Sequence, residues 1–318
     1  MKKIILAILA LFIASSVFGA KITGVRTTIA EEGFQFYVVV DALEQMGYDV
    51  EVTNPVEYAV SYKIIAQNKE NVSFMAANWD PLQDNMVDAV GRENLFIGGK
   101  YIENSAQGYL IDKKTADKYN IKYINDLKDP KIAKLFDING NGKADLAGCA
   151  PGWGCEGVIE YQLDAFGLRD TITHNQGSYS AILADTIARY KNGGSILYYT
   201  WTPYWVSGKL VPGKDVVFLQ VTHSEHPVLD STKLANGDDY GFAINTQRIV
   251  ANALTKKHKD IAKLFEIMKL NVNDVSGENL LMTKGESKEE DIVRHAKMWV
   301  KQNQTKIDAW IKEAKAAK

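Results

Sequence analysis

Three tryptophans of this chain lie next to turn-forming residues rather than in a regular apolar pattern. Trp79, Trp153 and Trp201 each have a glycine or a proline within two positions. Indole faces attract cations, so several of them around one cleft form a cage for a cation without hydrogen-bond donors, such as a quaternary ammonium. A single tryptophan of this kind is equally compatible with a loop that packs on the core, because large aromatic side chains are mostly buried. Three such contexts in one chain favour a binding site.

The segment that follows Trp153 also predicts a seat for an anion. A helix is expected over residues 155–166, so the N–H groups of Gly154 and Cys155 at its start should lack intrahelical acceptors. Such N–H groups and the helix dipole attract anions, and Gly154 has no side chain to keep a carboxylate away. A helix start solvated by water is the alternative. An aromatic wall beside an anion seat fits a small zwitterion with a carboxylate at one end and a bulky cation at the other.

Residues 1–19 have the pattern of a cleavable secretory signal peptide. Lys2 and Lys3 precede an apolar run from Ile4 to Ala14, and we place the cleavage site after Gly19. The apolar run is shorter than the roughly 20 residues of a membrane-spanning helix, which argues against an uncleaved anchor. No cysteine lies in or just after the segment to carry a bacterial lipid anchor. We therefore expect a protein that diffuses freely in the periplasm.

The charge balance gives no support to nucleic-acid binding. The chain has 37 Lys and Arg against 39 Asp and Glu, a formal net charge of −2, and loss of Lys2 and Lys3 with the signal peptide leaves −4. The charged fraction of 24% is ordinary, and no basic cluster stands out. A mature chain of about 300 residues is long enough to form two hydrophobic cores.

Strand-like and helix-like segments alternate along the chain, which indicates α/β domains of parallel construction. Trp79 and Trp201 fall just after predicted strands at 72–77 and 195–199, and Trp153 falls just before a predicted helix. Because ligands of open α/β sheets bind at the carboxyl ends of the strands, we expect the three indoles at such an edge.

The same alternation predicts two α/β units. The second unit begins near Gly108, and a strand at 241–244 returns the chain to the first. A long helix over 288–315, with Trp299 and Trp310 on its apolar stripe, is expected to pack on the first unit; a partner-binding helix is the alternative.

Cys149 and Cys155 are the two cysteines of the chain. In an exported protein we expect them to form a disulfide, which would hold residues 150–154 in place. A metal bound to a reduced pair would need further ligands, and none stands nearby.

Two other segments were weighed as metal sites. Residues 137–145 resemble the front of a calcium loop, but the twelfth position is Gly148 instead of a glutamate, so an Asn-Gly turn is favoured and calcium stays open. His223 and His226 read as part of a surface loop without metal. His174 precedes a glycine-containing turn and is expected to satisfy backbone groups. We predict no metal site and no cofactor.

Several longer motifs closely resemble the periplasmic glycine betaine-binding proteins (ProX type) of proline/glycine betaine ABC transporters. The similarity extends over nearly the whole chain. The segments that carry it are Asn78-Trp79, Pro81-Leu82, Ala106 to Lys114, Cys149 to Gly157, His174 to Gly177 and Tyr198 to Trp205.

This resemblance implies a two-lobed, hinged substrate-binding fold of the α/β class. Lobe I would comprise residues 20–106 plus 246–318 and lobe II residues 107–245, with the hinge near 106–108 and 241–244.

The resemblance also assigns roles to individual residues. By motif, the three cage tryptophans of the family fall on Trp79, Trp153 and Trp201. The amides that hold the ligand's carboxylate fall on Gly154 and Cys155, and the family's disulfide falls on Cys149 with Cys155. The family has a histidine four residues after the first cage tryptophan, where this chain has Gln83. Glutamine keeps a hydrogen-bond donor but cannot become charged.

We therefore expect a monomeric binding protein and not an enzyme. It would capture glycine betaine or a related zwitterion such as proline betaine, close around it, and dock on the membrane permease of an ABC importer for osmoprotectant uptake. The same fold with choline or a sulfonium analogue as ligand stays open. So does an enzyme that acts on a choline-like compound, although the sequence offers no nucleophile, acid–base pair or metal for it.

Overall fold

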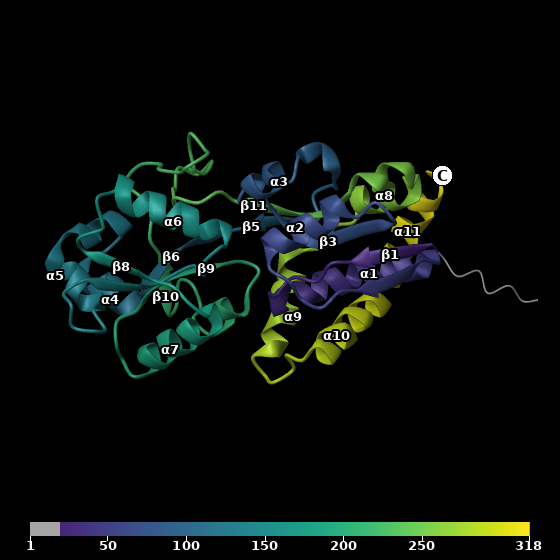
Figure 1. Ribbon diagram of the computed structural model, residues 1–318. Helices are drawn as coiled ribbons and strands as arrows, with labels where there is room; N and C mark the ends of the chain where they lie inside the picture. Colours follow the sequence, from purple (N-terminus) through teal and green to yellow (C-terminus); the bar gives the residue numbers. More distant parts are fainter. Residues whose placement is uncertain (1–19, 318) are drawn as a thin grey trace, which may run out of the picture.

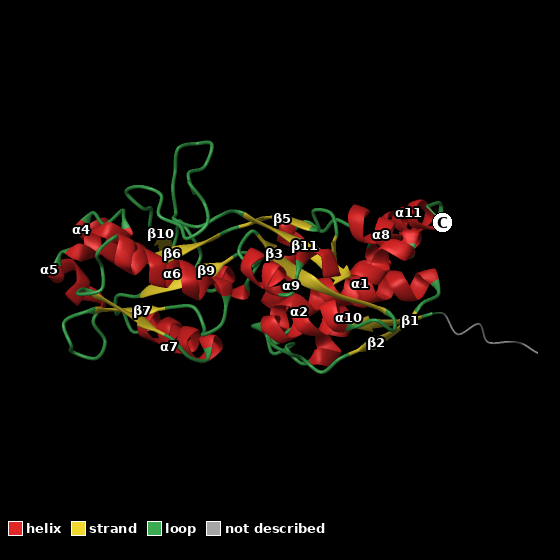
Figure 2. Cartoon of the chain, turned by 45° about the horizontal axis from the view of Figure 1, so that its top comes forward, coloured by secondary structure: helices red, strands yellow, loops and turns green. Residues whose placement is uncertain are grey.

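The computed structural model describes residues 20–317, which fold into two lobes that lie side by side (Figure 1). Each lobe contains one β-sheet, and helices pack around the strands of both lobes (Figure 2). We call the lobe that contains the first strand lobe I and the other lobe II. This is the two-lobed α/β architecture that the sequence predicts. The predicted signal peptide, residues 1–19, lies outside the described residues.

The sheet of lobe I has the strand order β2-β1-β3-β11-β4, with β5 also paired to β11. β1 pairs in parallel with β2 and β3, whereas β11 is antiparallel to β3, β4 and β5. The strands are β1 (Lys21–Gly24), β2 (Asp49–Val52), β3 (Val72–Asp80), β4 (Leu95–Ile97), β5 (Ile102–Ser105) and β11 (Asn245–Asn252).

The sheet of lobe II has the order β10-β6-β9-β7-β8. β7 pairs in parallel with β8 and β9, while β6 is antiparallel to β9 and β10. The strands are β6 (Gln107–Asp112), β7 (Ala144–Ala147), β8 (Ile172–Asn175), β9 (Leu197–Trp201) and β10 (Val216–Phe218).

Both sheets are therefore mixed, and the prediction of purely parallel construction was wrong. The strands through which the chain crosses between the lobes start at the edge where the lobes meet. β11 begins opposite the end of β3, with Thr246 beside Asp80, and β6 begins opposite the end of β9, with Gln107 beside Trp201. A strand that enters at this edge has to run against neighbours that end there, which makes it antiparallel.

The chain leaves lobe I after β5 and returns at β11. The lobe boundaries at 106/107 and 245/246 and the hinge stay predictions. The return strand begins at Asn245, so the predicted strand at 241–244 was wrong. Gly241 has a φ of +74° and its N–H donates to the Asp239 side chain, so the chain turns at this point instead of extending.

The helices of lobe I are α1 (Gly33–Met46), α2 (Tyr58–Gln67), α3 (Asp84–Ala89), α8 (Lys259–Ile267), α9 (Val272–Met282), α10 (Glu289–Gln302) and α11 (Gln304–Lys315). Those of lobe II are α4 (Lys113–Tyr119), α5 (Pro130–Ala133), α6 (Gly154–Ala165) and α7 (Tyr179–Lys191).

The single helix predicted over 288–315 is in fact two helices, α10 and α11. Asn303 separates them, because its N–H and its side-chain amide both donate to the carbonyl of Trp299, while its own carbonyl accepts from the next helix. Both helices pack on lobe I as expected. Trp299 and Trp310 are buried, and the Trp299 ring meets Phe34 of α1 edge-on at 6.1 Å between centroids.

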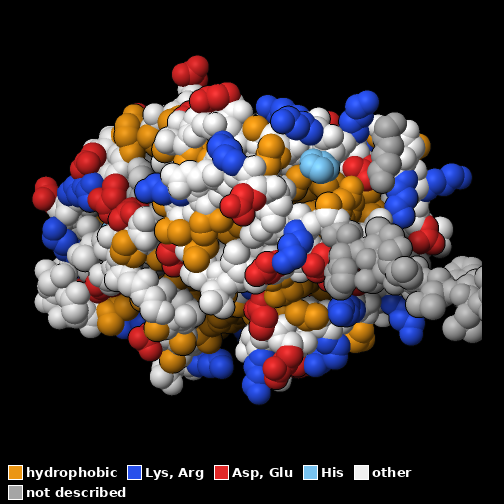
Figure 3. Space-filling model, turned by 45° about the vertical axis from the view of Figure 1, so that its right-hand side comes forward, with side chains coloured by type: hydrophobic (Ala, Val, Ile, Leu, Met, Phe, Trp, Pro, Cys, Tyr) orange, Lys and Arg blue, Asp and Glu red, His pale blue; other side chains and the backbone are white. Residues whose placement is uncertain are grey.

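No helix within residues 20–317 is long and apolar enough to cross a membrane. Lysine and arginine side chains are interspersed with acidic ones over the face shown in Figure 3, which fits the balanced charge of the chain.

A stack of phenylalanines joins the sheet of lobe I to its helices. Phe74 of β3 is fully buried, with ring centroids 5.5 Å from Phe36 of α1 and 5.4 Å from Phe265 of α8. Close packing of this kind makes the loss of a ring costly, since the surroundings collapse only in part.

We expect Phe74→Ala to lower the free energy of unfolding by about 3–5 kcal/mol, measured by urea denaturation followed by circular dichroism. Met298→Ala on α10, where the side chain is 52% exposed, is the matched control and should change it by less than about 0.5 kcal/mol. Equal stability of the two variants would contradict this account of the core.

Candidate functional site

The six residues predicted to bind ligand all line one cavity where the two lobes meet. The space between these residues amounts to about 360 Å³, part of which is open to solvent. Residues of both lobes form its wall: Ile29, Glu32, Tyr58, Trp79, Leu82 and Gln83 from lobe I, and Gln107, Trp153, Gly154, Cys155, Tyr199 and Trp201 from lobe II.

Two indoles of lobe II form adjacent walls at nearly a right angle. The ring centroids of Trp153 and Trp201 are 5.5 Å apart, with an interplanar angle of 79°. Tyr204 and Tyr179 pack on Trp201 at 4.3 Å and 4.9 Å between centroids. The tyrosines fill the space behind the indole, so its orientation is fixed by packing.

The third indole, that of Trp79, comes from lobe I. It lies within β3, whereas the sequence placed it just after a strand; Trp201 is likewise the last residue of β9. Both strands extend further than predicted because the crossing strands pair with them to their ends. Within residues 20–317 no ring contact joins Trp79 to Trp153 or Trp201. The indole N–H of Trp79 donates to Glu32 Oε1 at 2.9 Å.

The start of α6 has the geometry that the sequence predicts. Trp153 is the residue before the helix and has extended backbone angles, so the helical turn begins at Gly154. Neither the N–H of Gly154 nor that of Cys155 has an acceptor among the described residues. Gly154 also touches lobe I: a Cβ there would lie 2.8 Å from the carbonyl oxygen of Leu82. The position thus needs glycine for the lobes to come this close.

Gln83 is buried and its amide is oriented by two donors. Its Oε1 accepts from the backbone N–H of Trp79 at 3.1 Å and from the hydroxyl of Tyr62 at 2.9 Å. A backbone N–H can only donate, so the oxygen of the amide must face Trp79. The Nε2 therefore faces the other way, and no described residue accepts its hydrogens.

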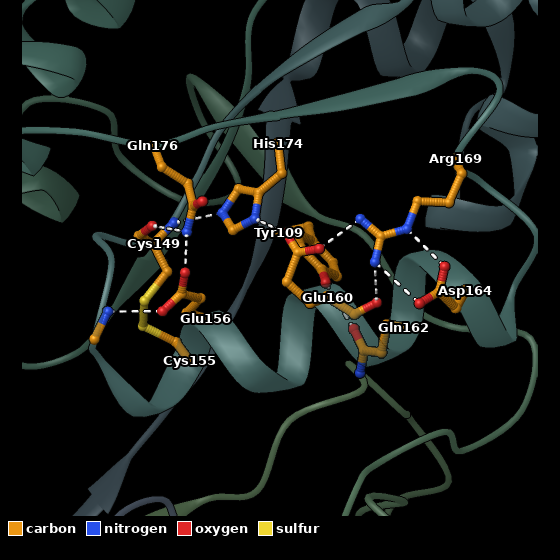
Figure 4. Close-up of polar contacts among 11 residues, drawn as sticks. Tyr109, Cys149, Cys155, Glu156, Glu160, Gln162, Asp164, Arg169, His174 and Gln176 are labelled. Atoms are coloured by element: carbon orange, nitrogen blue, oxygen red, sulfur yellow. Dashed lines mark hydrogen bonds and ion pairs between the residues drawn. A yellow bond between two sulfur atoms is a disulfide. The ribbon is translucent and has the colours of Figure 1, made fainter.

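The predicted disulfide between Cys149 and Cys155 is present, with 5.9 Å between the Cα atoms. Figure 4 shows the polar contacts that surround it. His174 Nε2 accepts from the backbone N–H of Cys149 at 3.0 Å, which confirms that this histidine satisfies the backbone. Because Nε2 accepts, Nδ1 carries the proton and donates to Glu160 at 2.6 Å.

Two carboxylates of α6 complete this network. Glu160 is held by His174 and by Arg169, and Glu156 accepts from the N–H of Gly152 at 2.6 Å and from Gln176 at 2.7 Å. Burial opposes ionisation of Glu160, but its hydrogen bonds from His174 and Arg169 outweigh this and lower the pKa of its carboxyl. The cysteine loop is thus tied to the same helix whose first N–H groups reach the cavity.

Sequence reasoning missed four polar residues of the cavity wall: Glu32, Tyr58, Gln107 and Tyr199. Gln107 Oε1 accepts from the hydroxyl of Tyr199, while its Nε2 is buried without a partner in the described structure. Gln107 belongs to one of the segments that carry the family resemblance, so a signal for it existed. Glu32 follows another glutamate at a helix start, where acidic residues are common on exposed surfaces, and nothing in the sequence marks it.

Residues 137–145, which resemble the front of a calcium loop, form a turn in which backbone N–H groups donate hydrogen bonds to the carboxylates of the same segment. Asp137 accepts from the N–H groups of Gly140 and Gly142 at 2.7 and 2.8 Å, and hydrogen bonds to these two N–H groups lower the pKa of its carboxyl. Asp145 accepts from the N–H of Ile138 at 2.6 Å. Within residues 20–317 no group of three or more His, Cys, Asp or Glu side chains is arranged to hold a metal ion.

Comparison with known proteins identifies relatives of high similarity. The family described as "Substrate binding domain of ABC-type glycine betaine transport system" matches residues 20–302. The glycine betaine-binding periplasmic protein OusX of Dickeya dadantii is 51% identical over 304 residues, covering 94% of this chain and 91% of that protein. The glycine betaine/proline betaine-binding periplasmic protein of Escherichia coli is 52% identical over 303 residues, with the same coverage.

Solved structures share the fold at lower identity. The glycine betaine/L-proline-binding protein ProX of Borrelia burgdorferi superposes with a TM-score of 0.71 at 19% identity, covering 94% of this chain and all (100%) of that one. Lactococcal OpuAC, closed around glycine betaine, superposes with a TM-score of 0.67 at 20% identity. The match covers 92% of this chain and 99% of that one. The match over residues 20–302 and the identities above 50% show that the chain belongs to the family of substrate-binding domains of ABC-type glycine betaine transport systems.

Proposed function

We propose that this chain is the periplasmic solute-binding component of an ABC importer and that it binds glycine betaine, or a related zwitterion such as proline betaine, between its lobes. One observation carries the proposal: a single cavity brings together three indoles and several hydrogen-bond donors that have no partner in the described protein. The relatives' names, which specify glycine betaine and proline betaine, support the same ligand class.

The cavity matches the two ends of such a ligand. The trimethylammonium head has no N–H to donate, so it gains from aromatic faces, and each cation–π contact contributes about 0.5–2 kcal/mol. The carboxylate gains from the N–H groups of Gly154 and Cys155 at the start of α6 and from Gln83 Nε2. Before the cost of ordering the ligand and the lobes is subtracted, three walls and three donors add up to the order of the roughly 8 kcal/mol of a micromolar complex.

Binding of this kind favours the closed form of the protein. The cavity wall is shared by both lobes, so a ligand that touches all of it stabilises the arrangement in which they meet. Rotation would occur at the two chain crossings, between lobe I (20–106 plus 246–318) and lobe II (107–245). The closed protein would then dock, as a monomer, on the permease after residues 1–19 have directed it to the periplasm.

The chemistry of the cavity supports binding and not catalysis. Its lining residues include one carboxyl, that of Glu32, but no serine, threonine, lysine or histidine, and Cys155 is held in a disulfide, so the described wall offers no activated nucleophile. Choline lacks a carboxylate and would leave the donors of α6 without a partner, so we rank it below the betaines. Turnover of choline or betaine by the purified protein would contradict this assignment.

Removal of one cage wall should be costly for affinity. We expect Trp153→Ala to weaken glycine betaine binding at least about tenfold, because one desolvated cation–π contact, worth about 2 kcal/mol or more, is lost. Isothermal titration calorimetry measures the effect. Tyr161→Ala, which removes an exposed aromatic side chain from the same helix, should leave the affinity unchanged. Unchanged affinity in the Trp153 variant would count against the cage.

Two glycines of α6 provide a matched pair for testing lobe closure. A Cβ at Gly154 would meet the Leu82 carbonyl oxygen at 2.8 Å, whereas a Cβ at Gly157 meets nothing within 4 Å. We expect Gly154→Ala to weaken glycine betaine binding roughly tenfold, since overpacking costs about 1–3 kcal/mol, and Gly157→Ala to leave it unchanged. Equal affinities of the two variants in titration would show that the Leu82–Gly154 contact does not control closure.

The amide of Gln83 can be tested with a substitution of the same shape. Gln83→Glu keeps an oxygen for Trp79 and Tyr62 but replaces the donor Nε2 with a second oxygen. We expect glycine betaine to bind at least about tenfold more weakly, because two carboxylates then face each other, while choline, which has none, should not lose affinity. If both ligands lost affinity equally in fluorescence titrations, Gln83 would not contact the carboxylate.

A further inference from the structure

Glu32 places a buried carboxyl group in the wall of the cavity. It is the last residue of the short 3-10 helix η1 (Ala30–Glu32) that precedes α1, and its side chain is 5% exposed. The sequence analysis assigned it no role, and the proposed contacts of the ligand do not use it.

The partners of Glu32 all donate hydrogen bonds to it. Oε1 accepts from the indole N–H of Trp79 at 2.9 Å and from the hydroxyl of Tyr58, and Oε2 accepts from the hydroxyl of Thr27 at 2.5 Å. An indole N–H cannot accept, so a proton on Oε1 would face a second hydrogen. The two hydroxyls can donate as well as accept, so the site has up to three donors for an ionised carboxylate, and a cation nearby would favour that form.

This carboxylate has no cationic partner in contact with it. No described residue forms a salt bridge with Glu32, and the guanidinium of the nearby Arg26 donates to Glu289 and to the backbone carbonyls of Thr27, Ile29 and Ala30. Burial raises the pKa of Glu32 above its ordinary value, against the lowering effect of its three hydrogen bonds. The charge of Arg26 also lowers the pKa of Glu32, but burial outweighs it. A buried carboxylate that makes no ion pair is costly, and a cation in the adjacent cavity would relieve that cost.

We propose that the Glu32 carboxylate is the counter-charge of the ligand's cationic head and thereby selects ligands with a cationic head over ligands with an uncharged head of the same shape. This inference rests on the proposed function, since it assumes a betaine in the cavity. The carboxylate acts in two ways. It attracts the cation directly across a medium of low dielectric constant, and through its bond to the Trp79 N–H it polarises the indole and makes the ring face more negative.

The test compares two ligands that differ in charge and not in shape. Glycine betaine and 3,3-dimethylbutanoate both carry a carboxylate and a head of three methyl groups, with a carbon in place of the ammonium nitrogen in the second. Their dissociation constants are measured by calorimetry, with displacement titration for the weaker ligand. The quantity compared between proteins is the ratio of the two constants.

We expect Glu32→Gln to reduce the preference for glycine betaine over 3,3-dimethylbutanoate at least about tenfold. Glu31→Gln removes a carboxyl one residue away that does not line the cavity; its ratio should equal that of the unmodified protein.

Each outcome decides one of the two proposals. Failure of the unmodified protein to bind glycine betaine overturns the proposed function. If that protein binds it, and Glu32→Gln weakens both ligands by the same factor or neither of them, the carboxylate has a structural role and the counter-charge is wrong. Should Glu32→Gln not fold, Glu32→Met removes the charge with a side chain of similar length that needs no hydrogen bonds, and the same ratio decides.

Discussion

The structure depends on keeping hydrogen-bond donors without acceptors at the wall of a buried cavity. The N–H groups of Gly154 and Cys155, Gln83 Nε2 and Gln107 Nε2 have no partner among the described residues. A buried donor left unpaired costs about 1–3 kcal/mol, so the empty closed form carries a cost that an anionic group in the cavity would remove. A ligand without such a group leaves that cost in place. The preference for ligands with an anionic group therefore depends on hydrogen-bond donors that the protein itself leaves without acceptors.

The rest of lobe II prevents these donors from finding partners by local rearrangement. The disulfide joins Cys155, within the first turn of α6, to Cys149 near the start of the loop after β7. His174 and Glu156 bind the backbone N–H groups of Cys149 and Gly152, so the N–H groups of the loop are used where they do not face the cavity. In lobe I the backbone of Trp79 orients Gln83 in the same manner. The donors that face the cavity keep no acceptor within the protein because the disulfide and these hydrogen bonds fix the residues next to them.

Local signals were sufficient for some of these features and insufficient for others. The helix start near Gly154 could be predicted because a tryptophan and two glycines precede residues with apolar side chains at helical spacing. The disulfide could be predicted because the N-terminal pattern indicates export. That Trp79 of one lobe lines the same cavity as Trp153 and Trp201 of the other depends on long-range packing, and here the family resemblance assigned the residues. Glu32 was missed because its partners, Tyr58 and Trp79, are distant in sequence. The predictions of a strand at 241–244 and of one continuous helix over 288–315 were wrong. In both places a side-chain hydrogen bond redirects or ends the backbone element, although the apolar spacing of the sequence suggests that it continues.

The two ends of a betaine would each touch both lobes, and this has a consequence for closure. The cationic head would meet Trp79 of lobe I together with Trp153 and Trp201 of lobe II, and the carboxylate would meet Gln83 of lobe I together with the start of α6. Either end alone would therefore draw the lobes together only in part. Because a ligand shifts a conformational equilibrium by no more than its differential affinity for the two states, a molecule that lacks one end would populate the closed form less. On this view the protein reports to its permease the presence of both charges and not merely the occupation of its cleft.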